Sequence, residues 1–288
     1  MRVEPYGTVR VRPPPRRRSD ARGEHASQGA RPQGAGPQGA RPQGAKPVKL
    51  ADSILPLCLD RVCYDAGGQR LIHNLSCTLS AGSRSIILGP NGAGKTLTLR
   101  LCHGLLRPTA GSVRWLGPAA ARAGERQAMV FQRPVMLRRS AAANIAYALA
   151  LRGVARRRRS EPVARALALV NLDAVARSPA RALSVGEQQR LGIARAWSTE
   201  PEVLFLDEPT ANLDPTATRA VEKAIQTIHD AGAKIVMTTH DLGQARRLAD
   251  EVLFMHRGRL VERAPAADFF AGPKTREAEA FLEGELLW

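Results

Sequence analysis

The sequence predicts an α/β fold with a mainly parallel sheet. Short apolar runs bounded by polar turns lie at residues 83–88, 203–207 and 234–239, as expected for strands that are buried on both faces. Between the last two runs, residues 215–230 have the pattern of a crossover helix that begins at a proline. This alternation of strands and helices indicates an α/β architecture.

The first fifty residues differ in composition from the rest of the chain. Residues 28–47 are four consecutive copies of Gln-Gly-Ala-x-Pro, each with a proline and a glycine and almost nothing apolar to bury. We expect residues 1–48 to be a disordered basic tail and residues 49–288 to form the folded domain. With 11 Lys and Arg against 3 Asp and Glu in residues 1–50, the tail could bind acidic partners. An inert extension, or an incorrectly chosen start codon, is an equal alternative.

The folded part is moderately basic, with 32 Lys and Arg against 23 Asp and Glu in residues 51–288. Such an excess could attract nucleic acid or an anionic membrane surface, but the simpler interpretation is a solvated surface. The four consecutive arginines at residues 156–159 are interpreted in the same way, as a solvated helix face, with contact to lipid headgroups as the alternative. Few aromatic residues lie among the basic ones, so we expect no nucleic-acid partner.

Cysteine spacing and hydropathy bear on the class of protein. The cysteines have neither a CxxC nor a paired zinc spacing, so we expect small reduced thiols at Cys58, Cys63, Cys77 and Cys102. The sequence contains no apolar run of about 18 or more residues, and residues 1–30 lack the apolar core of a signal peptide. We therefore expect neither a membrane-spanning helix nor export through a signal peptide.

A phosphate-binding loop lies between a predicted strand and a predicted helix. A first strand is expected at residues 57–64 and another at 83–88. The stretch GPNGAGKT (89–96) directly follows the second of these strands and fits the pattern GxxxxGK[ST]. It opens a helix that we expect to reach residue 106. Its glycines let backbone N–H groups face phosphates, because no Cβ blocks the approach. Lys95 supplies a positive charge toward the β and γ phosphates, and the Thr96 hydroxyl can ligate Mg²⁺. We expect the whole loop to bind nucleotide, through Gly89, Pro90, Asn91, Gly92, Ala93, Gly94, Lys95 and Thr96.

The stretch VLFLDEPT (203–210) adds two acidic residues at the end of a buried strand. Asp207 can hold Mg²⁺ through water, and Glu208 can polarise the attacking water as a general base. A solvated turn does not explain this pair, because four apolar residues precede it and a proline follows it.

Taken in order along the chain, these motifs resemble those of the nucleotide-binding subunits of ABC transporters, over roughly residues 51–270. The resemblance implies that Tyr64 stacks on adenine and that Gln132, in VFQRP, contacts Mg²⁺ and senses the permease. LSVGEQQR (183–190) resembles the signature motif, Asp214 in ANLD the D-loop, and His240 in TTHD the switch histidine near the γ-phosphate.

The resemblance also implies a domain organisation. We expect a P-loop NTPase core of the RecA-like type, with an antiparallel β edge and an α-helical subdomain inserted at about residues 134–187. Residues 143–153 and 161–170 have the helical apolar spacing for that subdomain. A C-terminal extension is expected at about residues 271–288, which is too short for a regulatory β-domain.

In this family two subunits pack head to tail, and each signature motif closes over the nucleotide on the partner's phosphate loop. We therefore expect a homodimer held by ATP, with the Ser184 side chain and the Gly186 N–H donating to the γ-phosphate from the start of a helix. The signature departs from the commonest form, LSGGQ, at two positions. Val185 adds bulk at a tight interface, and the Glu187 carboxylate would repel phosphate unless it points away.

The resemblance implies that the chain is the ATPase subunit of an importer. The subunit would bind separate integral permease subunits from the cytoplasmic face of the inner (plasma) membrane. An extracytoplasmic binding protein would deliver the substrate to the permease. A translation-associated ATPase would carry two cassettes, but the chain has one phosphate loop and one signature. A DNA-repair relative would have a long heptad insertion, for which the spacing of the motifs leaves no room. The ATPase subunit of an exporter, with its membrane domain in another chain, is a further alternative.

The transported substrate is indicated only by resemblance. Residues 239–270 and 278–288 look like the corresponding parts of the compact ATPases of oxyanion importers. The resemblance is closest to the tungstate type and less close to the phosphate and molybdate types. ATPases of polar amino-acid importers end in a similar way and are the alternative.

Overall fold

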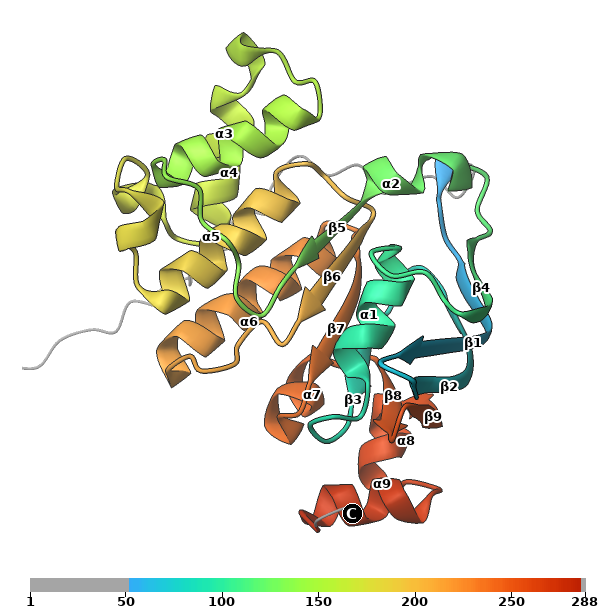
Figure 1. Ribbon diagram of the computed structural model, residues 1–288. Helices are drawn as coiled ribbons and strands as arrows, with labels where there is room; N and C mark the ends of the chain where they lie inside the picture. The colour runs from blue at the N-terminus through green and yellow to red at the C-terminus, as the bar shows by residue number, and fades with distance from the viewer. Residues whose placement is uncertain (1–51, 286–288) are drawn as a thin grey trace, which may run out of the picture. The chain divides into compact units, whose positions relative to one another are not determined.

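The larger sheet of the structure has the strand order β5-β6-β7-β3-β8-β9 (Figure 1). The structure is a computed structural model that describes residues 52–285, so the tail expected at residues 1–48 lies outside the described residues. The strands are β3 (Arg84–Leu88), β5 (Gln127–Val130), β6 (Val203–Asp207), β7 (Lys234–Thr239), β8 (Glu251–His256) and β9 (Arg259–Pro265). Neighbouring strands are parallel except for the pair β8 and β9. The predicted α/β fold with a mainly parallel sheet is confirmed.

A smaller antiparallel sheet has the order β2-β1-β4 and corresponds to the antiparallel edge that the resemblance implied. Its strands are β1 (Leu57–Ala66), β2 (Gln69–Leu79) and β4 (Ala110–Trp115). The strand predicted at 57–64 is β1, and the three predicted apolar strands are β3, β6 and β7. Every side chain of β6 and β7 is buried, which explains why these strands have continuous apolar runs and no alternation.

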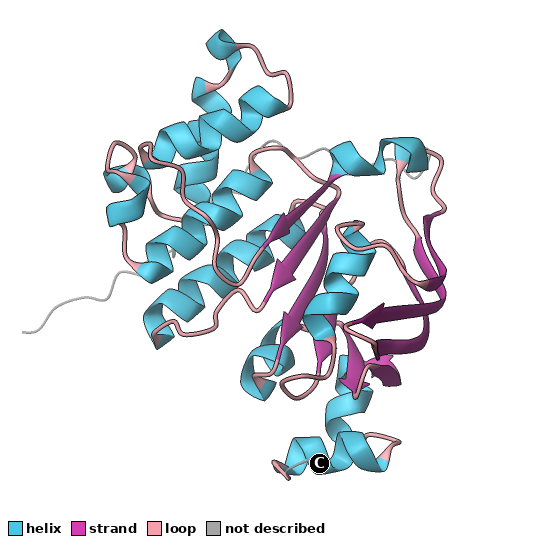
Figure 2. Ribbon diagram, in the orientation of Figure 1, coloured by secondary structure: helices cyan, strands magenta, loops and turns pink. Residues whose placement is uncertain are grey.

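Helices cover both faces of the larger sheet (Figure 2). They are α1 (Lys95–His103), α2 (Ala123–Arg126), α3 (Ala141–Leu151), α4 (Ser160–Leu169), α5 (Val185–Trp197), α6 (Pro215–Asp230), α7 (Leu242–Leu248), α8 (Ala266–Ala271) and α9 (Arg276–Glu283). Successive side chains of a strand point to opposite faces, so β3 contributes to two cores. Ile87 packs in a cluster with α1 and the antiparallel sheet. Ile86 packs in a cluster with α5 and α6.

The strand order brings three polar stretches to one edge of the sheet. Leu88 at the end of β3 lies beside Thr239 of β7, and Asp207 at the end of β6 lies beside Thr238. The loops that follow these parallel strands therefore leave the sheet together, which is where ligands bind in open α/β folds.

The segment between β5 and β6 contains α3 and α4, which are the helices predicted at 143–153 and 161–170. Ser140 caps α3 by accepting a hydrogen bond from the Ala143 N–H. The arginine run does not form a longer helix face, because its first three members make up a 3₁₀ turn (η3, Arg156–Arg158) between α3 and α4. Two further 3₁₀ turns, η4 (Asp173–Val175) and η5 (Ala180–Ala182), lead to α5.

The residues after β9 pack against the sheet. The rings of Phe281 and Phe254 have centroids 5.3 Å apart. The Glu262 carboxylate accepts hydrogen bonds from the backbone N–H groups of Lys274 and Thr275, just before α9. Within residues 52–285, no helix has both the length and the apolar character that crossing a membrane requires.

Candidate active site

The phosphate loop, residues 89–96, turns from the end of β3 into α1 through three glycines with positive φ. Gly89, Gly92 and Gly94 have φ values of 152°, 81° and 95°, which residues with a Cβ adopt at a cost. A Cβ on Gly89 would also lie 2.1 Å from the carbonyl oxygen of Met255. The loop conformation therefore requires glycine, and it leaves the first N–H groups of α1 available to an anion.

Lys95 is the buried cation of this loop. Its Nζ donates to the carbonyl oxygens of Gly89 at 2.8 Å and Pro90 at 3.0 Å, and lies 3.5 Å from Glu208 Oε1. Burial lowers the pKa of Lys95, and the charge of the neighbouring Glu208 opposes that shift. The ammonium group is thus held over the loop, opposite a carboxylate.

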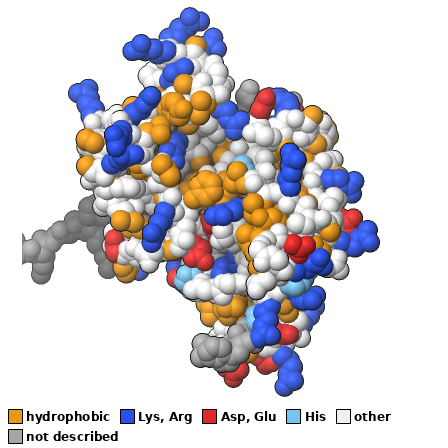
Figure 3. All heavy atoms as spheres, viewed as in Figure 1, with side chains coloured by type: hydrophobic (Ala, Val, Ile, Leu, Met, Phe, Trp, Pro, Cys, Tyr) orange, Lys and Arg blue, Asp and Glu red, His pale blue; other side chains and the backbone are white. Residues whose placement is uncertain are grey.

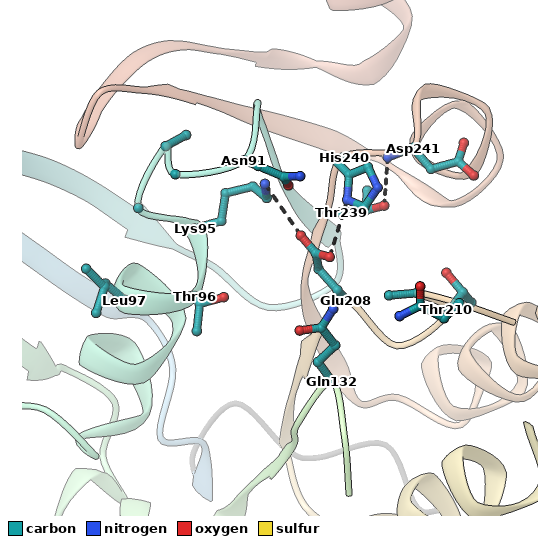
Figure 4. A pocket seen from close by; sticks show the side chains of 15 residues that line it. Asn91, Lys95, Thr96, Leu97, Gln132, Glu208, Thr210, Thr239, His240 and Asp241 are labelled. Atoms are coloured by element: carbon teal, nitrogen blue, oxygen red, sulfur yellow. Dashed lines mark hydrogen bonds and ion pairs between the residues drawn. The ribbon is translucent and has the colours of Figure 1, made fainter. Parts of the chain in front are cut away.

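Glu208 points into the space between Lys95 and His240 (Figure 4). Its Oε2 lies 3.3 Å from His240 Nδ1, and its backbone N–H donates to Thr238 Oγ1 at 2.9 Å. The residue has a φ of 43°, a left-handed conformation that costs a non-glycine residue about 1–2 kcal/mol. That conformation directs the carboxylate toward the phosphate loop at the point where β6 ends.

Asp207 lies beneath the loop with its carboxylate buried. Its Oδ1 accepts hydrogen bonds from Thr96 Oγ1 and from Thr238 Oγ1, both at 2.8 Å. Thr238 thereby connects Asp207 to the backbone of Glu208. The Thr96 hydroxyl and the Asp207 carboxylate are oxygen donors of the kind that Mg²⁺ prefers, and the described residues contain no cluster of three or more His, Cys, Asp and Glu ligands. This donor set fits a magnesium ion that takes its other ligands from water and phosphate oxygens.

Lys95, Glu208 and His240 border a cavity of about 750 Å³, a volume suited to a small-molecule ligand. The predicted residues that line it are Asn91, Gly92, Ala93, Gly94, Lys95, Thr96, Gln132, Glu208 and His240. The other lining residues are Leu97, Thr210, Ala211, Asn212, Thr239 and Asp241. Residues from four separate stretches of the chain thus meet around one space.

Comparison with known proteins identifies the family. The family model described as "ABC transporter" matches residues 72–211. The chain is 34% identical over 238 residues to "Phosphate import ATP-binding protein PstB 2" of Natronomonas pharaonis, which covers 77% of this chain and 84% of that protein. The chain belongs to the ABC transporter ATP-binding subunits. Proteins of this family are ATPases, and so is this chain.

Other relatives and solved structures belong to the same family. "Tungstate uptake system ATP-binding protein TupC" of Peptoclostridium acidaminophilum is 36% identical over 197 residues, covering 68% of this chain and 92% of that protein. "Methionine import ATP-binding protein MetN" of Nocardia farcinica is 37% identical over 223 residues, covering 74% of this chain and 67% of that protein. The structure of cbiO1 from Clostridium perfringens superposes with a TM-score of 0.67 at 25% identity, covering 75% of this chain and 90% of that chain.

Several residues assigned to the ABC motifs do not line the cavity of this subunit. Tyr64 lies on β1, where it is half-buried and packs against the cluster around α1. Asp214 caps α6 by accepting hydrogen bonds from the N–H groups of Thr216 and Ala217. Ser184 caps α5, and Gly186 lies in its first turn. Their predicted roles toward nucleotide stay predictions.

The signature stretch has structural roles within the subunit. A Cβ on Gly186 would lie 2.8 Å from the Cβ of Ala217 on α6, so the helix packing itself favours glycine there. Glu187 folds back on Ser184, accepting hydrogen bonds from its N–H at 2.9 Å and its Oγ at 2.8 Å. These hydrogen bonds lower the pKa of Glu187. Val185 is 67% exposed and leaves the first turn of α5 free of crowding within the subunit.

Thr238 was not among the predicted site residues, although it contacts both acidic residues of the site. The signal was present in KIVMTT, where a hydroxyl residue follows four strand residues that are buried in the sheet. A buried hydroxyl at the carboxyl end of a parallel strand requires a hydrogen-bond partner, and here the partner is Asp207.

Proposed function

We propose that this ATPase powers the uptake of an oxyanion of the tungstate or molybdate type. The site supports ATP hydrolysis, and the single observation that carries the mechanism is the Glu208 carboxylate held between Lys95 and His240. The oxyanion class is supported by two relatives that are named for phosphate and tungstate and by the resemblance of residues 239–270.

The proposed roles follow from the geometry. The glycine-rich loop and Lys95 bind the β and γ phosphates, and Glu208 accepts a hydrogen bond from the attacking water. His240 contacts the other carboxylate oxygen of Glu208 and holds it in position beside the γ-phosphate. Thr96, Asp207 and Gln132 are proposed to hold Mg²⁺ directly or through water, and the ion would neutralise charge on the phosphates.

We further propose that the complete site forms between two copies of the chain. Ser184, Gly186 and Asp214 lie outside the cavity of their own subunit, which supports a role toward the nucleotide of a partner. Once the Ser184 hydroxyl turns from Glu187 toward the partner's nucleotide, it and the first N–H groups of α5 offer donors and the positive end of the helix dipole to the γ-phosphate. ATP joins the two subunits because neither completes the site alone.

The Glu187→Gln variant is expected to form this dimer at a lower ATP concentration. Glutamine keeps an oxygen that accepts from the Ser184 N–H but removes a negative charge next to the proposed phosphate contact. Relief of roughly 1 kcal/mol of repulsion would tighten ATP-dependent dimerisation about five-fold. Analytical ultracentrifugation across an ATP titration measures this change.

The matched control is Glu187→Ala, which removes the charge and the capping hydrogen bonds together. It is expected to lose about 0.5–2 kcal/mol of stability, whereas Glu187→Gln keeps most of it. Unchanged or weaker dimerisation in Glu187→Gln would contradict a phosphate close to residue 187.

Exposed side chains beside Gln132 suit the proposed contact with membrane permease subunits. Phe131 is 40% exposed and Val135 is 73% exposed, on either side of the glutamine that lines the cavity. An apolar surface adjoining the nucleotide site supports coupling between a permease and ATP hydrolysis. The subunit would then act peripherally, at the cytoplasmic face of the inner membrane, on substrate delivered by an extracytoplasmic binding protein.

The substrate is tested with the chain purified together with its permease and binding protein in lipid. ATP hydrolysis is compared with tungstate, molybdate, phosphate, glutamine and methionine, and stimulation by tungstate or molybdate is expected. Methionine and glutamine are included because the match to MetN favours an amino acid as the second candidate. Stimulation by an amino acid alone would refute the oxyanion assignment, and an exporter would show no dependence on a binding protein.

A further inference from the structure

The positive charge of the chain outside its first fifty residues is concentrated in one segment. Residues 131–181 contain 11 arginines and only two acidic residues, Glu161 and Asp173. Residues 51–130 and 182–288 together contain 21 Lys and Arg and 21 Asp and Glu. The whole excess therefore lies in the part of the chain that includes α3 and α4, and the rest is electrically neutral.

Within residues 131–181, the arginines of η3 are three consecutive exposed cations, whereas the equally exposed Arg133, Arg138 and Arg177 stand apart along the chain. Arg156, Arg157 and Arg158 are exposed, and their guanidinium groups have no hydrogen bond or ion pair with any residue between 52 and 285. By contrast, Arg159 donates to the carbonyl oxygen of Val154, and Arg165 pairs with Glu161 and Glu200. Three adjacent unpaired cations repel one another, so an anionic partner would stabilise them.

The connection between α3 and α4, residues 152–159, projects away from the sheet (Figure 1). Leu151, the last residue of α3, is 70% exposed. On the face shown in Figure 3, Lys and Arg side chains gather over this part of the chain, together with apolar side chains and without visible acidic ones. Basic residues beside an exposed apolar side chain are typical of surfaces that meet the interface of a membrane.

We propose that the α3–α4 connection binds the anionic headgroups of a phospholipid membrane. The family places the subunit next to a bilayer, and this inference does not depend on which substrate is transported. A single-stranded nucleic acid would need open aromatic faces for base stacking. The Arg139 guanidinium occupies one face of the aromatic ring nearest along the chain, Tyr147, at 5.0 Å from its centroid.

The test measures binding of the full chain to vesicles of equimolar phosphatidylcholine and phosphatidylglycerol by co-sedimentation. Each arginine near an anionic surface strengthens binding about five-fold, so the triple variant Arg156→Gln, Arg157→Gln, Arg158→Gln is expected to bind at least about ten-fold more weakly. Binding of the unmodified chain to phosphatidylcholine alone is expected to be weak at physiological salt, because no headgroup charge attracts it.

The matched control is Arg107→Gln, Arg114→Gln, Arg276→Gln, which removes the same charge from exposed positions outside the segment. Both triple variants keep the basic first fifty residues and are expected to keep ATPase activity in detergent. A loss of less than two-fold is expected for the control. Equal losses in the two variants, or no loss in the first, would overturn the proposal. Tighter binding of a short RNA or an acidic peptide, through the same three arginines, would also overturn it.

Discussion

Replacement of Glu208 by glutamine is expected to abolish ATP turnover while ATP stays bound. The amide keeps the size of the side chain but cannot accept a proton from water, and loss of a general base lowers kcat by about 10²–10⁴-fold. Lys95 loses the carboxylate that lies 3.5 Å away, so its charge becomes fully available to phosphate. The Kd for ATP is therefore expected to stay the same or to decrease.

The variant should also accumulate as an ATP-bound dimer, which size-exclusion chromatography with Mg²⁺ and ATP detects. Glu279→Gln is a suitable control, because this glutamate is exposed on α9 and far along the chain from the site. Hydrolysis at the unmodified rate by Glu208→Gln would refute its role as the base. A variant that stays monomeric at high protein concentration would refute the composite site.

Replacement of Lys95 by methionine is expected to weaken ATP binding itself. A hydrogen bond to a charged group contributes about 1.5–3 kcal/mol, so the Kd for ATP should rise about 10- to 150-fold. Removal of the ammonium leaves Glu208 without the cation 3.5 Å away and leaves the carbonyl oxygens of Gly89 and Pro90 without its hydrogen bonds, so some loss of stability is expected beside the loss of affinity. Isothermal titration calorimetry with ATP measures the affinity, and thermal unfolding measures the stability.

Lys223→Met is the matched control, since this lysine is exposed on α6 outside the cavity. It is expected to leave the Kd for ATP unchanged. The pair of active-site variants separates two functions: Lys95→Met should weaken ATP binding, whereas Glu208→Gln should lose only turnover. If Lys95→Met bound ATP with unchanged affinity, the phosphate loop would not be the nucleotide site.

Much of the site was predictable because its parts are local. The phosphate loop is one stretch of eight residues, and its backbone follows from glycines at positions that require positive φ. The same holds for Asp207 and Glu208, which lie together at the end of one apolar strand. The fold class was predictable for a related reason, since strands buried on both faces have continuous apolar runs.

Features that depend on distant parts of the chain were not predictable. The position of β3 between β7 and β8 is a long-range pairing that no local pattern encodes. The link from Asp207 through Thr238 to Glu208 exists only because β6 and β7 are neighbours in register. The requirement for glycine at residue 186 likewise comes from Ala217 on another helix.

By itself, therefore, the sequence determined the chemistry that adjacent residues can carry: the anion-binding loop, the acidic pair and the strands that bear them. The tertiary structure alone decided which of these groups touch, that Gly186 packs against Ala217, and that three arginines of η3 have no partner among residues 52–285. The physical reason is that backbone conformation and burial follow from short-range sequence patterns. Hydrogen bonds and ion pairs between side chains act over a few ångströms, between residues that only the complete fold brings together.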